Sequence, residues 1–184
     1  MARTTKYSKE DILEKSVEFI KEYSYSKLTV RELAKYIGCS TQPIFKNYAN
    51  FDKYKKDLKS YLRKDYESFI SKYVDKDDYL YTISYAYALY AKKEPNVFFS
   101  LFMADLAGSR TVEEVLNTAR NFETIEAMVK QYNVSLEEAK RIYREVRFYT
   151  HGISTQLCVN SIKLTDKEIK DLIRNNIEIN LRGN

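Results

Sequence analysis

The chain of 184 residues contains two prolines, four glycines, two cysteines and one histidine. So few helix breakers, together with weak strand-like alternation, predict an all-α protein. No stretch approaches the roughly 18 apolar residues of a membrane span, and the N-terminus lacks the apolar core and cleavage site of a signal peptide. We therefore expect a cytoplasmic protein without a membrane partner. Cys39 and Cys158 have no CxxC pattern or neighbouring histidines, which predicts two reduced thiols and no metal site.

Residues 28–48 encode two short helices around one glycine. The spacing of Thr29 and Glu32 predicts a capping box that opens the first helix, and Gly38 can adopt the left-handed conformation that ends it. Pro43 falls in the first turn of the second helix, where a proline costs no hydrogen bond. An amphipathic segment before them supplies a third helix. Three helices in this order are typical of a helix-turn-helix unit.

Charge is distributed unevenly along the chain. Residues 1–64 carry 15 basic and 8 acidic side chains, a net charge of +7, whereas residues 65–184 carry 16 and 18, a net charge of −2. Clustered basic side chains suit the neutralisation of phosphates, so we expect double-stranded DNA as a partner. The cluster around the motif comprises Arg3, Lys6, Lys27, Arg31, Lys35, Lys46, Lys53, Lys55, Lys56 and Lys59.

The region around residues 8–60 resembles the DNA-binding part of bacterial TetR-family transcriptional regulators. The likeness rests on the Thr-capped helix, the turn Gly38-Cys39-Ser40, and a recognition helix that carries Ile44-Phe45 and Asn47-Tyr48. Farther on, the sequence Tyr149-Thr150-His151-Gly152 is similar to an aromatic-His-Gly sequence in some members. The resemblance implies a ligand-responsive regulator that binds palindromic operator DNA as a homodimer and is released by a small effector. A repressor is favoured over an activator, although the sequence does not distinguish the two.

The second helix of the motif is expected to lie in the major groove. Four side chains in this region are predicted to face base edges, and four other residues around the motif are predicted to contact phosphates. The predicted DNA-binding residues are Thr29, Ser40, Thr41, Gln42, Phe45, Lys46, Asn47, Tyr48 and Lys53. Base edges are assigned to Thr41, Gln42, Lys46 and Asn47, and phosphates to Thr29, Ser40, Tyr48 and Lys53. We place the DNA-binding domain at residues 1–52 and a helical ligand-binding and dimerisation domain at residues 53–184.

Six further helices are predicted after the motif, which gives about nine in all. They cover residues 51–74, 77–93, 97–106, 112–132, 136–160 and 166–182. Capping boxes at Thr111–Glu114, Ser135–Glu138 and Thr165–Glu168 open the last three. The segment 77–93 has almost no polar face, so it is predicted to be a central, buried helix.

The chain has 17 tyrosines against nine phenylalanines, an unusual ratio for a dry core because a buried hydroxyl needs a partner. Some tyrosines are therefore expected at water, an interface or a cavity. Together with the resemblance, this ratio predicts a pocket for a small, largely apolar or aromatic effector. The predicted pocket residues are Tyr85, Phe102, Met103, Met128, Tyr149 and His151. For His151 a hydrogen-bonded packing role is the alternative.

Apolar residues recur at helical spacing along the last two predicted helices. We expect part of these stripes to pack against a second copy in a two-fold four-helix bundle. The predicted interface residues are Val146, Ile153, Leu157, Ile169, Ile173 and Ile177. The alternative is that both stripes pack inward on the chain's own core.

No catalytic constellation is apparent in the sequence. It has no Gly-rich phosphate loop, no G-x-S-x-G or H-E-x-x-H motif, and no paired carboxylates in an apolar setting. We predict no enzyme activity, no catalytic residues and no cofactor. The alternative function is a TetR-like helical ligand-binding or interaction protein that docks on another regulator without binding DNA. Phe51, at a position where family members often have a lysine, favours that alternative.

Overall fold

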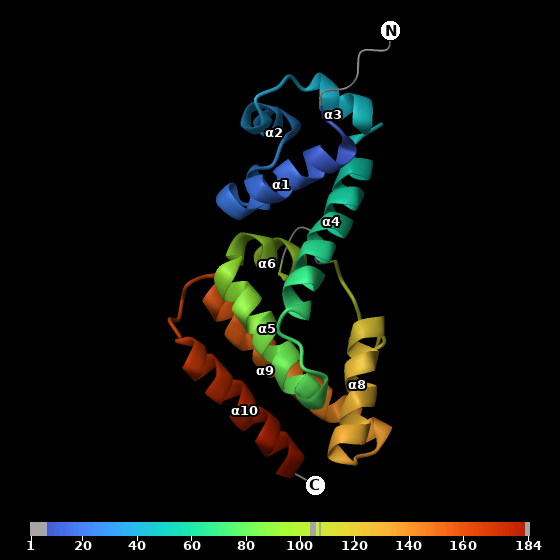
Figure 1. Cartoon of the computed structure of the whole chain (residues 1–184), viewed down its shortest axis with the longest axis vertical. Helices are drawn as coiled ribbons and strands as arrows, with labels where there is room; N and C mark the ends of the chain where they lie inside the picture. The colour runs from blue at the N-terminus through green and yellow to red at the C-terminus, as the bar shows by residue number, and fades with distance from the viewer. Residues whose placement is uncertain (1–6, 104–105, 107, 183–184) are drawn as a thin grey trace. The chain divides into compact units, whose positions relative to one another are not determined.

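The computed structural model describes residues 7–103, 106 and 108–182, and every regular element among them is a helix (Figure 1). The predicted all-α class of about nine helices is confirmed. The α-helices are α1 (Lys9–Tyr23), α2 (Val30–Ile37), α3 (Gln42–Asn47), α4 (Phe51–Ser71), α5 (Tyr79–Lys93), α6 (Pro95–Phe102), α7 (Val112–Leu116), α8 (Ala119–Tyr132), α9 (Leu136–Cys158) and α10 (Asp166–Arg182). Two 3₁₀ turns, η1 (Tyr25–Lys27) and η2 (Lys76–Asp78), precede α2 and α5.

The tenth helix arises because the helix predicted over residues 112–132 is broken between α7 and α8. Thr118 has an extended backbone, with φ −65° and ψ 144°. Asn117 Nδ2 bonds Glu113 Oε1 at 2.8 Å, and the Thr118 hydroxyl donates to the carbonyl of Val115 at 3.2 Å. Such local side-chain bonds compete with helix continuation. The helix predicted over 97–106 ends at Phe102, and its residues 104 and 105 lie outside the described part of the chain.

Contacts divide the chain into two compact units. The first comprises residues 1–67 and 94–107, and the second comprises residues 68–93 and 108–184. The division therefore falls within α4 rather than at the predicted position between residues 52 and 53, and α6 belongs with the N-terminal helices.

In the first unit, α1 packs against α2, α3 and α6. The helix starts follow the sequence signals only in part. Ser8 and Asp11 form a complete capping box, whereas at α2 the Thr29 hydroxyl accepts from the Glu32 amide at 3.1 Å without the reciprocal bond. Gly38 ends α2 with φ 75° and ψ 38°, the left-handed conformation expected of it. The two short helices are thus held by the core that α1 provides.

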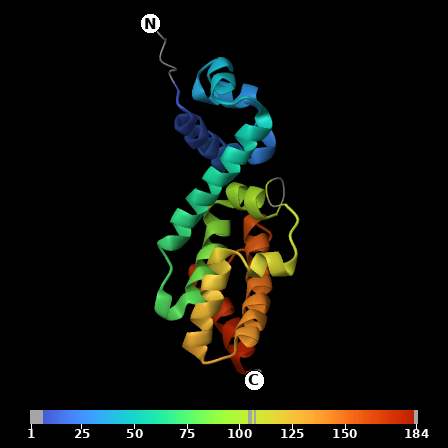
Figure 2. The same ribbon diagram turned by 90° about the vertical axis from the view of Figure 1, so that its right-hand side faces the viewer.

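In the second unit, α5 packs against α8, α9 and α10 (Figures 1 and 2). Ten of its residues are buried, among them Tyr87 and Tyr90, because neighbours cover it on several sides. The sequence prediction of a central buried helix is correct. Among the described residues, no helix has both the length and the apolar character that crossing a membrane requires.

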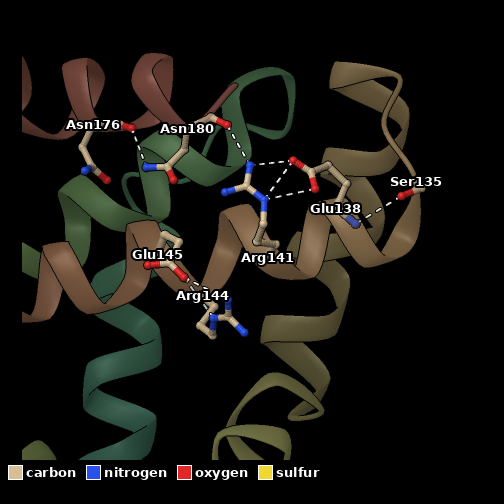
Figure 3. A network of polar contacts seen from close by, with 7 residues as sticks. All are labelled: Ser135, Glu138, Arg141, Arg144, Glu145, Asn176 and Asn180. Atoms are coloured by element: carbon tan, nitrogen blue, oxygen red, sulfur yellow. Dashed lines mark hydrogen bonds and ion pairs between the residues drawn. The ribbon is translucent and has the colours of Figure 1, made fainter. Parts of the chain in front are cut away.

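Arg141 links α9 to the C-terminal end of α10 (Figure 3). Its guanidinium donates to Glu138 Oε1 at 2.5 Å and to the carbonyl of Asn180 at 3.0 Å. The Ser135 hydroxyl still accepts from the Glu138 amide at 3.2 Å. Because the Glu138 carboxylate turns to Arg141, the structure has one half of the predicted capping box at the start of α9.

Candidate nucleic-acid interface

The short helix α3 presents one face to solvent. Ile44 is 2% exposed and anchors α3 in the core, whereas Phe45 is 59% exposed. Gln42 and Lys46 are also exposed, and Pro43 lies in the first turn as predicted. Three of the predicted DNA-binding side chains, an amide, an aromatic ring and an ammonium group, therefore project from one small helix. Thr41, next to them, is half-buried and makes no capping bond.

Three other predicted residues lie at helix starts. Thr29 is the N-cap of α2, Ser40 is exposed in the turn before α3, and Lys53 is exposed in the first turn of α4. The N-terminal end of a helix carries a partial positive charge and unsatisfied amide groups, which suit an anionic oxygen. The structure thus brings hydroxyl groups, a lysine and helix dipoles to positions typical of phosphate contacts.

Most exposed cations described in the first unit form no ion pair with a carboxylate. Among the described residues these are Lys9, Lys27, Arg31, Lys35, Lys46, Lys53, Lys56 and Lys64. Lys55 differs, because it pairs with Asp52 at 2.8 Å. Arg3 and Lys6 lie outside the described residues. A set of unpaired cations keeps its full charge available for a polyanion.

Two predicted DNA-binding residues do not face solvent as expected. The Asn47 amide donates to the carbonyls of Pro43 at 2.8 Å and Tyr7 at 3.1 Å, so it ties the end of α3 to the segment before α1. Tyr48 is 2% exposed and its ring packs edge-on against Tyr54, 5.1 Å away. Burial raises the pKa of Tyr48 to about 12. Both side chains are structural, because a short helix needs its ends fastened.

The six predicted effector residues lie in different surroundings. Phe102 and Met103 belong to the first unit and the other four to the second. Met128 is fully buried in the core, Tyr149 is 37% exposed, and Tyr85 has the ammonium group of Lys170 4.9 Å from its ring centroid. The effector pocket remains a prediction.

His151 pairs with a tyrosine of the central helix. Its Nδ1 lies 2.9 Å from the Tyr87 hydroxyl, between α9 and α5. Burial, followed by the positive charge of Arg147, lowers the pKa of His151. The adjacent Thr150 hydroxyl is buried with no hydrogen-bond partner among the described residues. This part of α9 therefore has an unsatisfied polar group beside a neutral imidazole.

The predicted dimer residues are core residues, and the prediction that they lie at an interface is wrong. Val146, Ile153 and Leu157 on α9 and Ile169, Ile173 and Ile177 on α10 are all at most 8% exposed within one chain. They form one cluster with residues of α5 and α8. The stripes pack inward because a small unit needs both of them to complete its own core.

A different face of α9 is apolar and exposed. Phe148 is 58% exposed, and it borders a groove of about 350 Å³ that also includes Tyr149, Gly152 and Ile162. The sequence contained a signal for this face that the periodicity analysis missed. Residues 136–147 carry seven charged side chains, whereas residues 148–162 carry none. Depletion of charge on exposed positions is typical of the centre of a protein interface.

No protein-family model matches the chain, and no curated protein matches it. The resemblance to TetR regulators therefore rests on the motif residues alone. The described residues include no group of three or more His, Cys, Asp or Glu side chains that could hold a metal ion.

Proposed function

We propose that the protein is a DNA-binding transcriptional regulator. The observation that carries the proposal is the exposed face of α3: Gln42, Phe45 and Lys46 project from a helix whose buried residue Ile44 fixes its orientation. An α-helix fits the major groove, where glutamine suits adenine and lysine suits guanine. Unpaired cations around α2 and α4 support the proposal because phosphate contacts supply most of the affinity for DNA.

We further propose a homodimer formed through the exposed face of α9. One short recognition helix reads few base pairs, so two copies are needed for a specific site. Phe148 projects from this face, and Gly152 lies one turn away with open space where a Cβ would stand. Antiparallel pairing of two α9 helices places each Phe148 over Gly152 of the other copy, which satisfies two-fold symmetry.

The second unit is the proposed site of effector binding. Support comes from the buried Thr150 hydroxyl, which lacks a partner among the described residues, and from the neighbouring pair Tyr87 and His151. An unsatisfied buried donor is a free-energy cost that a bound molecule can offset. Helix α4 contributes residues to both units and supplies a covalent route for coupling an effector to DNA affinity.

The proposal is tested by electrophoretic mobility shift with the full chain and a random duplex at low salt. We expect binding that weakens by orders of magnitude between about 50 and 200 mM salt, because several phosphate contacts release counterions. The double variant Lys46→Gln/Lys53→Gln should bind more weakly, whereas Lys130→Gln/Lys163→Gln, with the same loss of charge in the second unit, should bind nearly as the wild type.

Absence of any shift at low salt would overturn the DNA-binding proposal and favour a helical protein that docks on another regulator. If both double variants lose affinity equally, net charge rather than the α3 face determines binding. If instead only Lys46→Gln/Lys53→Gln loses affinity, sequencing the fragments that the protein retains from its own genomic DNA would identify the operator.

A further inference from the structure

A cleft of about 550 Å³ opens on the first unit where the end of α1, the turn η1 and the start of α2 meet. Its volume is within the range of small-molecule sites in proteins. Neither the effector prediction nor the α3 face uses this cleft, which lies entirely within the first unit.

Three aromatic rings form one wall of the cleft. Phe19 packs against Tyr23 and Tyr36 with ring centroids 5.1 and 5.4 Å apart, and the two tyrosine rings stand edge to face at 6.1 Å. The Glu22 carboxylate accepts a long hydrogen bond of 3.5 Å from the Tyr36 hydroxyl, and a hydrogen bond from Tyr23 to Glu22 raises the pKa of Tyr23. The wall is therefore formed before any ligand arrives, which reduces the entropy lost on binding.

The rim of the cleft carries charged groups that form no ion pair with any residue in the described part of the chain. Lys27 and Lys35 form no ion pair among the described residues, and neither does Glu32. The residues that line the cleft thus carry two ammonium groups against one carboxylate, a net charge of +1, while the Glu22 carboxylate lies outside the lining and accepts hydrogen bonds from the two tyrosines of the wall. Thr29 adds the N-terminal end of α2, whose dipole also favours an anion.

We propose that this cleft binds a small aromatic carboxylic acid. The ring of the ligand packs against Phe19, Tyr23 and Tyr36, and its carboxylate lies between Lys27 and Lys35. A neutral aromatic molecule uses only the wall, and a cationic one meets the net positive rim. Selectivity for the acid therefore follows from the unpaired lysines.

The regulatory consequence rests on the proposed function. Thr29 and Lys27 line the cleft and also belong to the surface proposed to contact phosphates. A bound carboxylate occupies the same cations, so acid and DNA compete directly within the first unit. This competition requires no conformational signal from the second unit.

Binding is tested with indole-3-acetate as the probe and the full chain without DNA. The chain has no tryptophan, so with excitation at wavelengths longer than the tyrosine absorption band the fluorescence anisotropy of the indole reports only the ligand. We expect saturable binding of indole-3-acetate, with indole-3-acetamide and tryptamine about fivefold to tenfold weaker, because a charge-assisted contact is lost. In Lys27→Gln/Lys35→Gln, in which two exposed lysines are replaced, the affinity for indole-3-acetate should fall to that for indole-3-acetamide. In Lys130→Gln/Lys163→Gln the affinity for indole-3-acetate should not change.

The proposed site would be overturned by equal affinity for indole-3-acetate and indole-3-acetamide, or by unchanged affinity for indole-3-acetate in Lys27→Gln/Lys35→Gln. It would also be overturned if millimolar indole-3-acetate showed no saturable binding. Competition is measured separately, by displacement of a labelled duplex. If indole-3-acetate binds without displacing DNA, only the proposed competition is overturned. If the protein binds indole-3-acetate but no DNA, the proposed site is supported and the proposed DNA-binding function is overturned.

Discussion

The hydroxyl of Tyr54 in α4 donates a hydrogen bond of 2.7 Å to the hydroxyl of Ser16 in α1, and both groups are buried. Ser16 in turn donates to the carbonyl of Ile12 at 2.5 Å. Burial raises the pKa of Tyr54, so the phenol remains protonated and keeps its role as donor. This chain of bonds joins α4 to α1 inside the core of the first unit.

Removing both partners of this pair should cost little more than removing one. Ser16→Ala leaves the Tyr54 hydroxyl buried without its acceptor, and we expect a loss of about 1–3 kcal/mol in the free energy of unfolding. In Ser16→Ala/Tyr54→Phe the second substitution should add little. Urea denaturation followed by circular dichroism measures both, with the exposed Ser60→Ala as control. Simple additivity of the two single substitutions would contradict the argument.

Lys46 is expected to read a base. Its side chain is exposed on α3 and has no ion-pair partner among the described residues. Lys46→Ala should weaken operator binding by about 1–3 kcal/mol and relax the preference at one base pair. Titrations on operator variants measure this preference. If affinity falls equally on operator and random duplex, Lys46 contacts a phosphate instead.

Asn47 should act on stability rather than on base preference. Because its amide bonds the carbonyls of Pro43 and Tyr7, Asn47→Ala should lower the free energy of unfolding by about 1 kcal/mol or more. The ranking of operator variants should stay as in the wild type. A changed ranking with unchanged stability would show that the side chain turns to the DNA.

One substitution at each of two residues of α9 distinguishes a residue of the proposed dimer interface from a residue of the core. Phe148 is exposed, so Phe148→Glu should give a folded monomer with weakened operator affinity. Leu157 is 8% exposed within the core, and Leu157→Glu should unfold the second unit because a buried unpaired charge costs several kcal/mol. Sedimentation velocity and circular dichroism distinguish the outcomes. A wild type that sediments as a monomer, or a dimeric Phe148→Glu, would refute this interface.

Stability should fall on mild acidification because of His151. Its pKa is lowered in the folded protein, so the unfolded chain binds more protons near neutral pH. The contribution of neutral His151 to the free energy of unfolding is complete above the ordinary imidazole pKa of about 6.5. It is lost as the pH falls through that value toward the lowered pKa of His151 in the folded protein. The chain has one histidine, so His151→Gln should flatten thermal unfolding midpoints between about pH 7.5 and 5.5. An unchanged slope would exclude His151 as the cause.

The sequence predicted most helices because their starts are local events. Thr111 with Glu114 and Thr165 with Glu168 form the predicted boxes, and Gly38 has the predicted left-handed backbone. Burial was harder to predict, because it depends on distant partners. Periodicity showed that Leu157 lies on an apolar stripe, but it could not show whether that stripe faces the chain's own core or another copy.

The side chains of α3 illustrate the same limit. Gln42 and Lys46 are exposed as predicted, whereas Asn47 turns toward Tyr7, forty positions away in the chain. The cleft beside Tyr23 and Tyr36 joins α1 to α2 through tertiary packing, so no local pattern in the sequence indicates it.

Helix α6 has a consequence for synthesis. It belongs to the first unit although it follows α5 in the chain; Asn96 donates to the carbonyl of Lys21 at 2.9 Å, and Tyr66 stacks edge-on with Phe102 at 5.0 Å. A ribosome that has released only residues 1–67 has therefore not yet delivered the segment that covers α1. The N-terminal helices are complete only after α5 and then α6 have emerged. A fragment that stops after α4 leaves apolar surface of α1 open to aggregation.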